Sequence, residues 1–479
     1  MGKFSWKRGL AFVLAAALII STVVFAILSA VSALAEEDRT PRYEIDMVFD
    51  ERLLGVSVSE RLFYVNETGQ DLSALYFALP INAFRRQGTF PTEEGATIGG
   101  ASIASVAVDG KEAQWGVQGD AETTLRISCY LEKGEWCEIA IALEALLPMA
   151  NGLIGASEDS IRLYGIFPIL AGYDASIDDF VVNEYCALDT KVFAEASEWD
   201  ITFHTPSAYS LCAGGTVGMT KASNGGCIWK IAQSKTRCPL LVFGKNYRLY
   251  EGKSARVYAF SKTVARNALS ACENVLPAYE MWFGAYPYGK IAVAQTTGFR
   301  DAGAAGAILI TGEDTEYAVA FEAAKMWFGE SVGNDNAKEA WLSDAVSAYV
   351  ALLYFEERYG YDRFLKELND RVLPALQITI PGLLYPDTET TRMGDIATYD
   401  EVVKLRGAAC MHELRNLIGR EKFLHGLKLL VERRKGEIAT IADFAACMNE
   451  ASGRETDRFV METFRDIGNY VQQNLEWYE

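Results

Sequence analysis

Hydrophobic residues recur at every second position along the first half of the chain. Tyr43, Ile45, Met47 and Phe49 begin this pattern, which is typical of a strand with one buried face. Similar short runs follow at residues 75–79, 124–130, 136–142, 199–204 and 227–231, with Gly, Asn and Ser clusters between them. This part of the chain is predicted to form an antiparallel β domain.

After Tyr258 the hydrophobic period changes to that of helices with one charged face. Helices are predicted over residues 264–283, 315–328, 338–359, 362–376, 402–418, 421–434 and 441–451, with strand-like pieces at 291–294 and 307–311. The predicted fold class is therefore multidomain α+β. Its parts are an N-terminal segment (1–35), the β domain (36–250) and a mainly helical domain (251–479).

The N-terminal segment has the features of an export signal. Lys3, Lys7 and Arg8 precede an apolar run over residues 10–31, and small residues lead up to Ala35. This order predicts a secretory signal cleaved after Ala35. The run is also about as long as the roughly 20 residues that span a bilayer, so a retained membrane anchor is the alternative. In both cases the rest of the chain is expected outside the cytoplasm.

Composition excludes some classes of function. Half of the 479 residues are hydrophobic, which is enough for two globular cores, and the net charge is −19. Nucleic-acid binding is not expected, because phosphate recognition needs a basic surface. The nine cysteines form no C-x-x-C metal pattern. Cys129 and Cys137 flank a turn in a predicted hairpin, and the loop length leaves open whether they face each other.

Two segments of the helical half share an unusual motif. Residues 321–329 read F-E-A-A-K-M-W-F-G, and residues 341–349 read W-L-S-D-A-V-S-A-Y. These segments resemble the gluzincin aminopeptidases of the membrane alanyl aminopeptidase type. In that family a helix carries H-E-x-x-H followed by W-F-G, two His bind zinc and the Glu activates the metal-bound water. The third ligand is a Glu 19 positions later in a W-L-x-E-G-x-A-x-Y segment, and 19 positions also separate Lys325 from Asp344.

The resemblance implies a thermolysin-like peptidase domain with zinc as cofactor, but the metal ligands are substituted. Phe321 and Lys325 stand at the two His positions, and neither a phenyl ring nor an ammonium group offers a lone pair to a metal. Asp344 stands at the position of the ligand Glu. Glu322 alone matches the family's general base. We therefore expect no zinc and no confident catalytic residue.

Other positions of the family's site are substituted as well. The segment that holds the substrate's amino end matches residues 300–306, where Asp301 and Gly303 lie but no Glu is present. The transition-state tyrosine position matches Lys404, and Tyr399, five residues earlier, cannot simply be transferred to it. Histidine is rare throughout the chain: His204, His412 and His425 are its three histidines, and no two have H-x-x-x-H spacing.

A buried pair of carboxylates without a metal needs either a proton or another cation. We expect Lys325 to supply that cation to Glu322 and Asp344. The alternative is that Lys325 extends into solvent and the site is only degenerate.

Three functions are compatible with the sequence. The first is an inactive pseudopeptidase that binds a peptide or protein in a cleft between the β domain and the helical domain. Tyr279, Trp282, Phe283 and Tyr286 either line this cleft or pack in the core. The second is a metal-independent hydrolase that uses Glu322 and Asp344 as a carboxylate pair. The third is an active zinc aminopeptidase with other ligands.

Overall fold

The computed structural model describes residues 39–473 apart from 86–95, 187, 189–190, 298–299 and 379–381. The apolar run at 10–31 and the predicted cleavage point after Ala35 lie outside the described residues. Within the described ranges, none of the helices combines the length and the apolar character that crossing a membrane requires.

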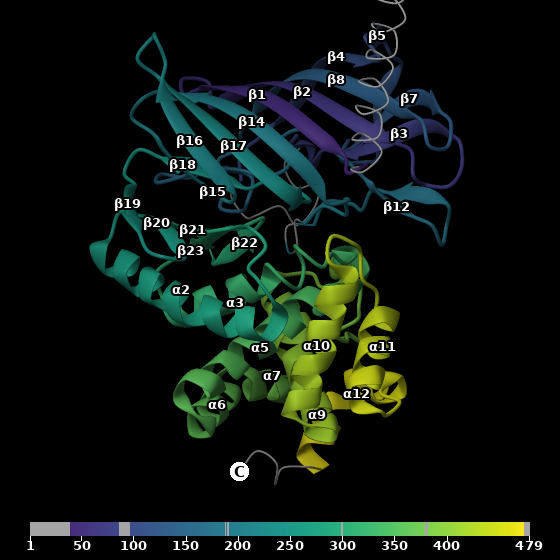
Figure 1. Cartoon of the computed structure of the whole chain (residues 1–479), viewed down its shortest axis with the longest axis vertical. Helices are drawn as coiled ribbons and strands as arrows, with labels where there is room; N and C mark the ends of the chain where they lie inside the picture. The colour runs from purple at the N-terminus through teal and green to yellow at the C-terminus, as the bar shows by residue number, and fades with distance from the viewer. Residues whose placement is uncertain are drawn as a thin grey trace, which may run out of the picture.

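The β domain consists of sheets that enclose one core, at the purple-to-teal end of the molecule (Figure 1). Its largest sheet has eight strands in the order β16-β17-β14-β1-β2-β8-β4-β5, and four-stranded sheets have the orders β15-β18-β10-β9 and β11-β3-β7-β6. The strands are β1 (Arg42–Asp50), β2 (Gly55–Val65), β3 (Leu72–Ala78), β4 (Gly100–Val108), β5 (Lys111–Glu112), β6 (Trp115–Gln118), β7 (Thr124–Leu131), β8 (Trp136–Leu146), β9 (Gly155–Ala156), β10 (Ile161–Leu163), β11 (Ile169–Leu170), β12 (Gly172–Asp174), β13 (Asp179–Val181), β14 (Ser197–Thr205), β15 (Ser210–Ala213), β16 (Thr216–Lys221), β17 (Cys227–Thr236) and β18 (Leu241–Gly244), and a short 3₁₀ helix, η1, covers Pro80–Phe84.

The alternating residues of β1 face this core, as their period predicts. Tyr43, Ile45, Met47 and Phe49 are all buried, because side chains two apart lie on one face of a strand. Most neighbouring strands are antiparallel, as expected, but β1 and β14 pair in parallel.

The predicted hairpin around Cys129 and Cys137 is wrong. Their strands, β7 and β8, belong to different sheets: β7 pairs with β3 and β6, and β8 pairs with β2 and β4. Both cysteines are buried free thiols. The short connection therefore takes the chain from one sheet to another instead of closing a ladder.

The second half begins with a smaller sheet, of order β19-β20-β21-β23-β22. Its strands are β19 (Arg248–Glu251), β20 (Ala255–Ala259), β21 (Ile291–Gln295), β22 (Ala302–Ala304) and β23 (Ala307–Ile310). Figure 1 shows this sheet between the β domain and the helices α2 and α3. Since β19 starts at Arg248, the change of architecture falls just before the domain boundary that the sequence predicts.

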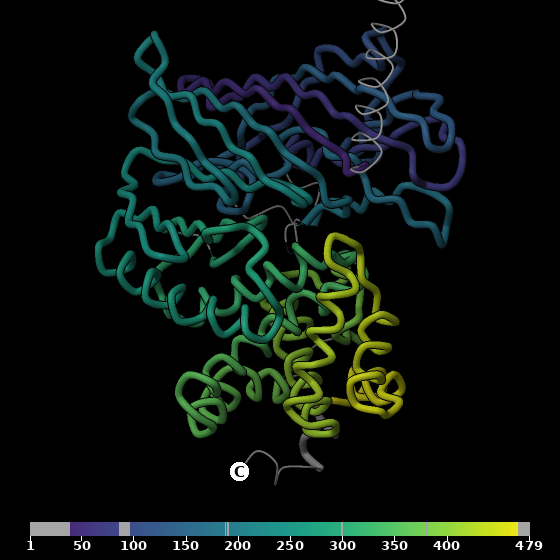
Figure 2. The backbone as a smooth tube through the Cα atoms, viewed as in Figure 1, coloured from purple at the N-terminus to yellow at the C-terminus, as the bar shows by residue number. Residues whose placement is uncertain are grey.

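The helices occupy the other end of the molecule, and Figure 2 shows their green-to-yellow backbone opposite the purple-to-teal β domain. They are α2 (Lys262–Phe283), α3 (Thr315–Lys325), α4 (Asn336–Glu339), α5 (Trp341–Tyr359), α6 (Tyr361–Glu367), α7 (Leu373–Gln377), α8 (Ile396–Tyr399), α9 (Gly407–Ile418), α10 (Arg420–Arg434), α11 (Ile441–Ser452) and α12 (Asp457–Gln473), with π-helical segments η2 (Leu368–Val372) and η4 (Asp400–Arg406) and a short 3₁₀ helix, η3 (Thr390–Arg392). The predicted α+β class, with an N-terminal antiparallel β domain before a mainly helical one, is confirmed.

Helix α3 differs from its predicted extent at its C-terminal end, where the candidate site residues lie. It ends at Lys325 instead of residue 328, so the W-F-G residues after it form a turn. Phe321, Glu322 and Lys325 thus lie at the C-terminal end of α3, directly before the chain turns towards α5.

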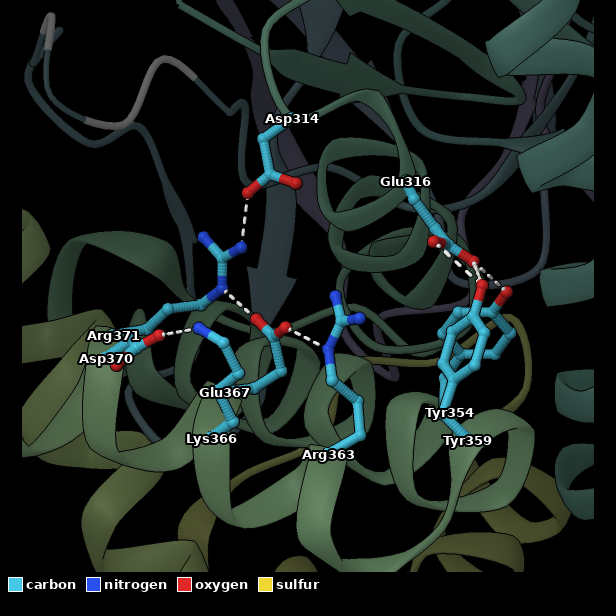
Figure 3. Close-up of polar contacts among 9 residues, drawn as sticks. All are labelled: Asp314, Glu316, Tyr354, Tyr359, Arg363, Lys366, Glu367, Asp370 and Arg371. Carbon is cyan, nitrogen blue, oxygen red and sulfur yellow. Dashed lines mark hydrogen bonds and ion pairs between the residues drawn. The ribbon is translucent and has the colours of Figure 1, made fainter.

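The N-terminal end of α3 is fixed by a polar network (Figure 3). Arg371 pairs with Asp314 and, through Nε, with Glu367 Oε2 at 2.5 Å. Arg363 Nε lies 2.6 Å from Glu367 Oε1. Separately, the hydroxyls of Tyr354 and Tyr359 donate to Glu316 Oε1 at 2.6 and 2.8 Å. The network joins the start of α3 to α5, α6 and η2.

Candidate functional site

A cavity of about 160 Å³ lies between the two halves of the chain. Its wall includes Gly152 and Leu153 from the β domain, and residues of α3, α5, β22 and η4 from the helical half. All positions that match the family's zinc, amino-end and transition-state motifs line this cavity: Asp301, Gly303, Phe321, Glu322, Lys325, Asp344 and Lys404. The structure therefore brings together positions that are more than 100 residues apart in the sequence.

The centre of the cavity wall is an ion pair between α3 and α5. Lys325 Nζ lies 3.0 Å from Asp344 Oδ1, and the two side chains are only 12 % and 10 % exposed. Lys325 is in the last turn of α3 and Asp344 in the first turn of α5. Helix dipoles favour a cation at a C-terminus and an anion at an N-terminus, so both backbones stabilise the charges they carry.

Asp344 has further partners that keep it ionised. Its Oδ2 accepts a hydrogen bond from the Tyr399 hydroxyl at 2.9 Å, and its Oδ1 accepts one from Ser343 Oγ at 3.1 Å. Burial raises the pKa of Asp344, but Lys325 and then Lys191 lower it by more, and the net pKa lies well below its ordinary value. Asp344 is therefore a carboxylate at neutral pH.

Glu322 is in a contrasting environment. Its Oε2 lies 3.9 Å from Lys325 Nζ, beyond hydrogen-bond distance, and has no hydrogen-bond partner in the described part of the chain. A Cβ atom on Gly303 would approach this oxygen to 2.9 Å, so the glycine lets β22 pass close to α3. Burial raises the pKa of Glu322, with Lys325 opposing and Asp344 adding to that rise. Two neighbouring carboxyl groups thus have pKa values displaced in opposite directions.

Tyr399 and Lys404 reach the site from the same segment. Tyr399 directly precedes η4, and Lys404 is five residues further on. A π-helical turn closes over five residues, so positions i and i+5 lie one above the other. Tyr399 accordingly contacts Asp344, while Lys404 Nζ lies 3.9 Å from the centre of the Phe321 ring.

Asp301 lies on the wall formed by the small sheet. Its Oδ1 accepts hydrogen bonds from Thr311 N at 2.8 Å and Thr311 Oγ1 at 3.1 Å. Burial raises the pKa of Asp301, against the effect of these bonds and of Lys404.

Lys191 enters the site from the connection between β13 and β14. Its Nζ donates to Ser343 Oγ at 3.3 Å and lies 3.8 Å from Glu330 Oε1. Burial raises the pKa of Glu330, and the nearby Lys191 and Arg237 limit that rise. The β-domain side of the molecule thus supplies cations to the buried carboxylates of the helical half.

These side chains do not fit a zinc ion. Phe321 offers no donor atom, and the ammonium of Lys325 is 3.0 Å from the one carboxylate at a matching ligand position, Asp344. Across the ranges that the structure describes, no three His, Cys, Asp or Glu side chains are placed to hold a metal ion. A zinc ion at this point would also meet the positive charge of Lys325.

Comparison with known proteins finds a family match in the helical half. Residues 309–464 match the model of the peptidase family M1 domain. This match covers about a third of the chain, within its helical half. The chain is 27 % identical over 163 residues to glutamyl aminopeptidase of Bos taurus and 29 % identical over 165 residues to aminopeptidase N of Lactococcus lactis subsp. lactis. Each alignment covers 33 % of this chain, but only 17 % and 19 % of these two M1 relatives.

Solved structures resemble the whole two-part architecture. The M1 zinc metallopeptidase of Deinococcus radiodurans has a TM-score of 0.62 at 16 % identity, over 88 % of this chain and 93 % of that one. A substituted form of it bound to a Tyr-Ser-Ala substrate has a TM-score of 0.61 over 89 % and 94 % of the two chains. At this identity the similarity establishes the M1 fold alone.

Some residues at the M1 site could not be found from the sequence. Lys191 is in the β-domain half, with no local signal that it contacts α5. The spacing of Tyr399 from Lys404 does not match the family's motif, yet the Tyr399 hydroxyl donates to Asp344 Oδ2, and Lys404 lines the cavity.

Other sequence candidates lie away from the cavity. Tyr279, Trp282, Phe283 and Tyr286 are buried in the helical core, where Tyr279, Phe283 and Tyr286 pack around Trp327. His412 Nδ1 lies 2.9 Å from the Tyr349 hydroxyl, and burial, then Arg415, lower its pKa to about 3. It is a neutral structural histidine.

Proposed function

We propose that this protein is an M1 pseudopeptidase that binds a ligand in the cavity between its two halves without hydrolysing it. The observation that carries the proposal is the Lys325–Asp344 ion pair at 3.0 Å. It provides a cation where the family resemblance implies zinc, and it leaves Glu322 without a metal-bound water to activate.

The bound partner is proposed to be a peptide or a protein segment. A solved M1 relative is bound to a Tyr-Ser-Ala substrate, and this chain has a cavity with both charged and apolar walls at the interface of its halves. Nucleic acid is not proposed, because the net charge of −19 repels phosphates.

The protein is also proposed to act outside the cytoplasm. Support comes from the basic residues before the apolar run at 10–31, which are typical of a secretory signal or a membrane anchor. Protease digestion of intact cells, followed by detection of the β domain, tests this proposal. A protected, full-length protein in the cytoplasm would contradict it.

A hydrolysis assay tests the proposed inactivity. Purified protein is incubated with aminoacyl p-nitroanilides and with short peptides, in the presence of added zinc or of a chelator. We expect no turnover above the buffer control under either condition. Turnover that a chelator abolishes would show an active metallopeptidase with other ligands and would overturn the proposal.

One observation favours a second candidate, a metal-independent hydrolase. Carboxyl pairs act as acid and base when their surroundings separate their pKa values, and the pKa of Glu322 is raised while that of Asp344 is lowered. Chelator-resistant hydrolysis that Glu322→Gln abolishes would establish this function. The ion pair argues against it, because Asp344 is already occupied by Lys325 and Tyr399.

A further inference from the structure

The cavity contains one ammonium group that is not paired with a carboxylate. Lys325 pairs with Asp344 at 3.0 Å, Arg300 Nη1 lies 3.5 Å from Asp400 Oδ1, and Lys191 Nζ lies 3.8 Å from Glu330 Oε1. For Lys404, the described residues provide no carboxylate oxygen within the 4.0 Å of an ion pair. The charge of the Lys404 ammonium is therefore not neutralised by direct contact with a carboxylate.

The contacts of Lys404 compensate this charge only in part. Its Nζ lies 3.9 Å from the centre of the Phe321 ring and 6.0 Å from that of Tyr317. A ring face attracts a cation more weakly than a carboxylate does and accepts none of the three N–H bonds as a conventional acceptor. Lys404 therefore retains donors for a ligand in the cavity that it lines.

A second group in the wall is also without a partner. Glu322 is nearly fully buried, and its Oε2 has no hydrogen-bond partner among the described residues. Burial raises the pKa values of Glu322 and Asp301, and Lys404 opposes both shifts.

We propose that the cavity binds a small monocarboxylate whose carboxylate accepts hydrogen bonds from Lys404. This inference rests on the proposed function, since the site has to bind its ligand without cleaving it. The apolar part of the ligand contacts Leu153, Ala302 and Ala318 on the wall. A volume of about 160 Å³ suits a small acid or the last residue of a peptide.

A monoanion fits better than a phosphate. Among the lining residues that the structure describes, Lys404 is the one cation without an ion-pair partner, whereas Asp301 and Asp400 also face the cavity and repel a second negative charge. The carboxylate can come from a free acid or from a peptide C-terminus, because the two share the same recognition chemistry.

Calorimetric titration with a matched pair of probes tests the proposal. N-acetyl-L-alanine and N-acetyl-L-alaninamide have the same apolar body, but only the first has a carboxylate. We expect the acid to bind at least about tenfold more tightly than the amide, as is typical of a charge-assisted hydrogen bond. Lys404→Met is expected to remove this preference and leave the weak binding of the amide unchanged.

A control variant distinguishes the loss of Lys404 from the loss of one positive charge elsewhere on the protein. Lys428→Met removes an exposed lysine on α10 whose partner is Glu432 at 3.7 Å, and it should bind the acid as the wild type does. The thermal unfolding of Lys404→Met is compared with the wild type, because Lys404 has no ion pair to lose. Equal binding of acid and amide, or unchanged acid binding by a folded Lys404→Met variant, would overturn the proposal.

Two further probes identify the source of the carboxylate. Tri-alanine binding that requires its free C-terminus would assign the site to peptide ends, and binding of N-acetyl-L-alanine without tri-alanine would assign it to small free acids. Tighter binding of inorganic phosphate than of either would contradict a monocarboxylate site. Hydrolysis is measured on the same preparation, so chelator-sensitive turnover would contradict the pseudopeptidase proposal separately from the binding result.

Discussion

The two ends of helix α3 use the same interaction in different surroundings. At the C-terminal end, Lys325 and Asp344 form a pair whose side chains are 12 % and 10 % exposed. Beside the network that contacts the N-terminal end of α3, Lys366 of α6 pairs with Asp370 of η2, and these two side chains are 65 % and 58 % exposed (Figure 3). Both are lysine–carboxylate pairs.

Burial determines how much each ion pair contributes to the free energy of unfolding. Water screens the exposed pair, which contributes little to stability. The buried pair has given up hydration, so removal of one partner leaves an uncompensated charge in the interior. Lys325 is therefore expected to be required for stability, whereas Lys366 is expected to be replaceable.

The largest effect is expected for Lys325→Met. It should lower the free energy of unfolding by about 3–5 kcal/mol near neutral pH, because Asp344 and Glu322 lose their cation. Urea unfolding measures the change. The double variant Lys325→Met/Asp344→Leu is the matched control and should recover most of the loss. Equal stability of Lys325→Met and wild type would mean that Lys325 does not compensate the site.

The pH dependence of the same variant sharpens this test. In the wild type the pKa of Asp344 is lowered on folding, so its contribution persists at neutral pH and is lost only as pH falls below about 4. Without Lys325, burial should instead raise this pKa, and the variant should gain stability as pH falls from neutral towards about 5. If the wild type and the variant both lost stability to the same extent as pH falls, Lys325 would not be the group that keeps Asp344 ionised.

Glu413 is a buried carboxyl group with no ion pair among the described residues, and stability should depend on its titration in the opposite direction from that of Asp344. Neither of its oxygens has a hydrogen-bond partner in the part of the chain that the structure describes. Burial raises its pKa from 4.5 to about 7. The folded state therefore holds a proton that the unfolded state releases, and stability falls as pH rises from about 4.5 to about 7.

This loss should be no more than about 3 kcal/mol, at about 1.4 kcal/mol per pH unit. Glu413→Gln cannot titrate, so the difference in unfolding free energy between it and the wild type should change over this pH range. A difference that stays constant with pH would show that Glu413 does not titrate there.

A smaller effect is expected at the better-buried part of the Figure 3 network. Glu367 is 6 % exposed and accepts from Arg363 Nε at 2.6 Å and Arg371 Nε at 2.5 Å. Glu367→Gln keeps the shape but places an amide N–H against a guanidinium. The expected loss is about 2 kcal/mol, as for hydrogen bonds to charged groups, measured by urea unfolding. A loss as large as that of Lys325→Met would remove the contrast between the two ends of α3.

The smallest effect is expected for Lys366→Met, which removes the exposed pair with Asp370. The free energy of unfolding should change by less than about 0.5 kcal/mol. This variant loses the same charge as Lys325→Met, so the two changes together isolate the effect of burial. A loss above about 2 kcal/mol would show that exposure does not govern these pairs.

Hydrophobic periodicity predicted most of the fold because it reports which face each element buries. The alternation at Tyr43–Phe49 located β1, and the period of the second half located α2, α5 and α10. The partner of a strand is set by contacts distant in sequence, so the connection between Cys129 and Cys137 was interpreted as a hairpin although it joins two sheets.

The site was predicted to the extent that its positions have fixed spacing along the chain. Phe321, Glu322, Lys325 and Asp344 were predicted together because they match positions of the family's motifs, with 19 positions between Lys325 and Asp344. Lys191 was missed since it comes from a connection more than 100 residues earlier. Tyr399 could not be assigned because it lies five residues before the motif position at Lys404, and the sequence carried no signal for the π-helical segment between them.

The central claim is that Lys325 has replaced the metal at this site, and zinc content tests it most directly. Wild-type protein and the variant Phe321→His/Lys325→His/Asp344→Glu are purified with added zinc, dialysed and analysed for bound metal. The account predicts no stoichiometric zinc in the wild type and about one zinc per chain in the variant, which regains three donors on adjoining helices. Stoichiometric zinc in the wild type, lost on treatment with a chelator, would contradict the account.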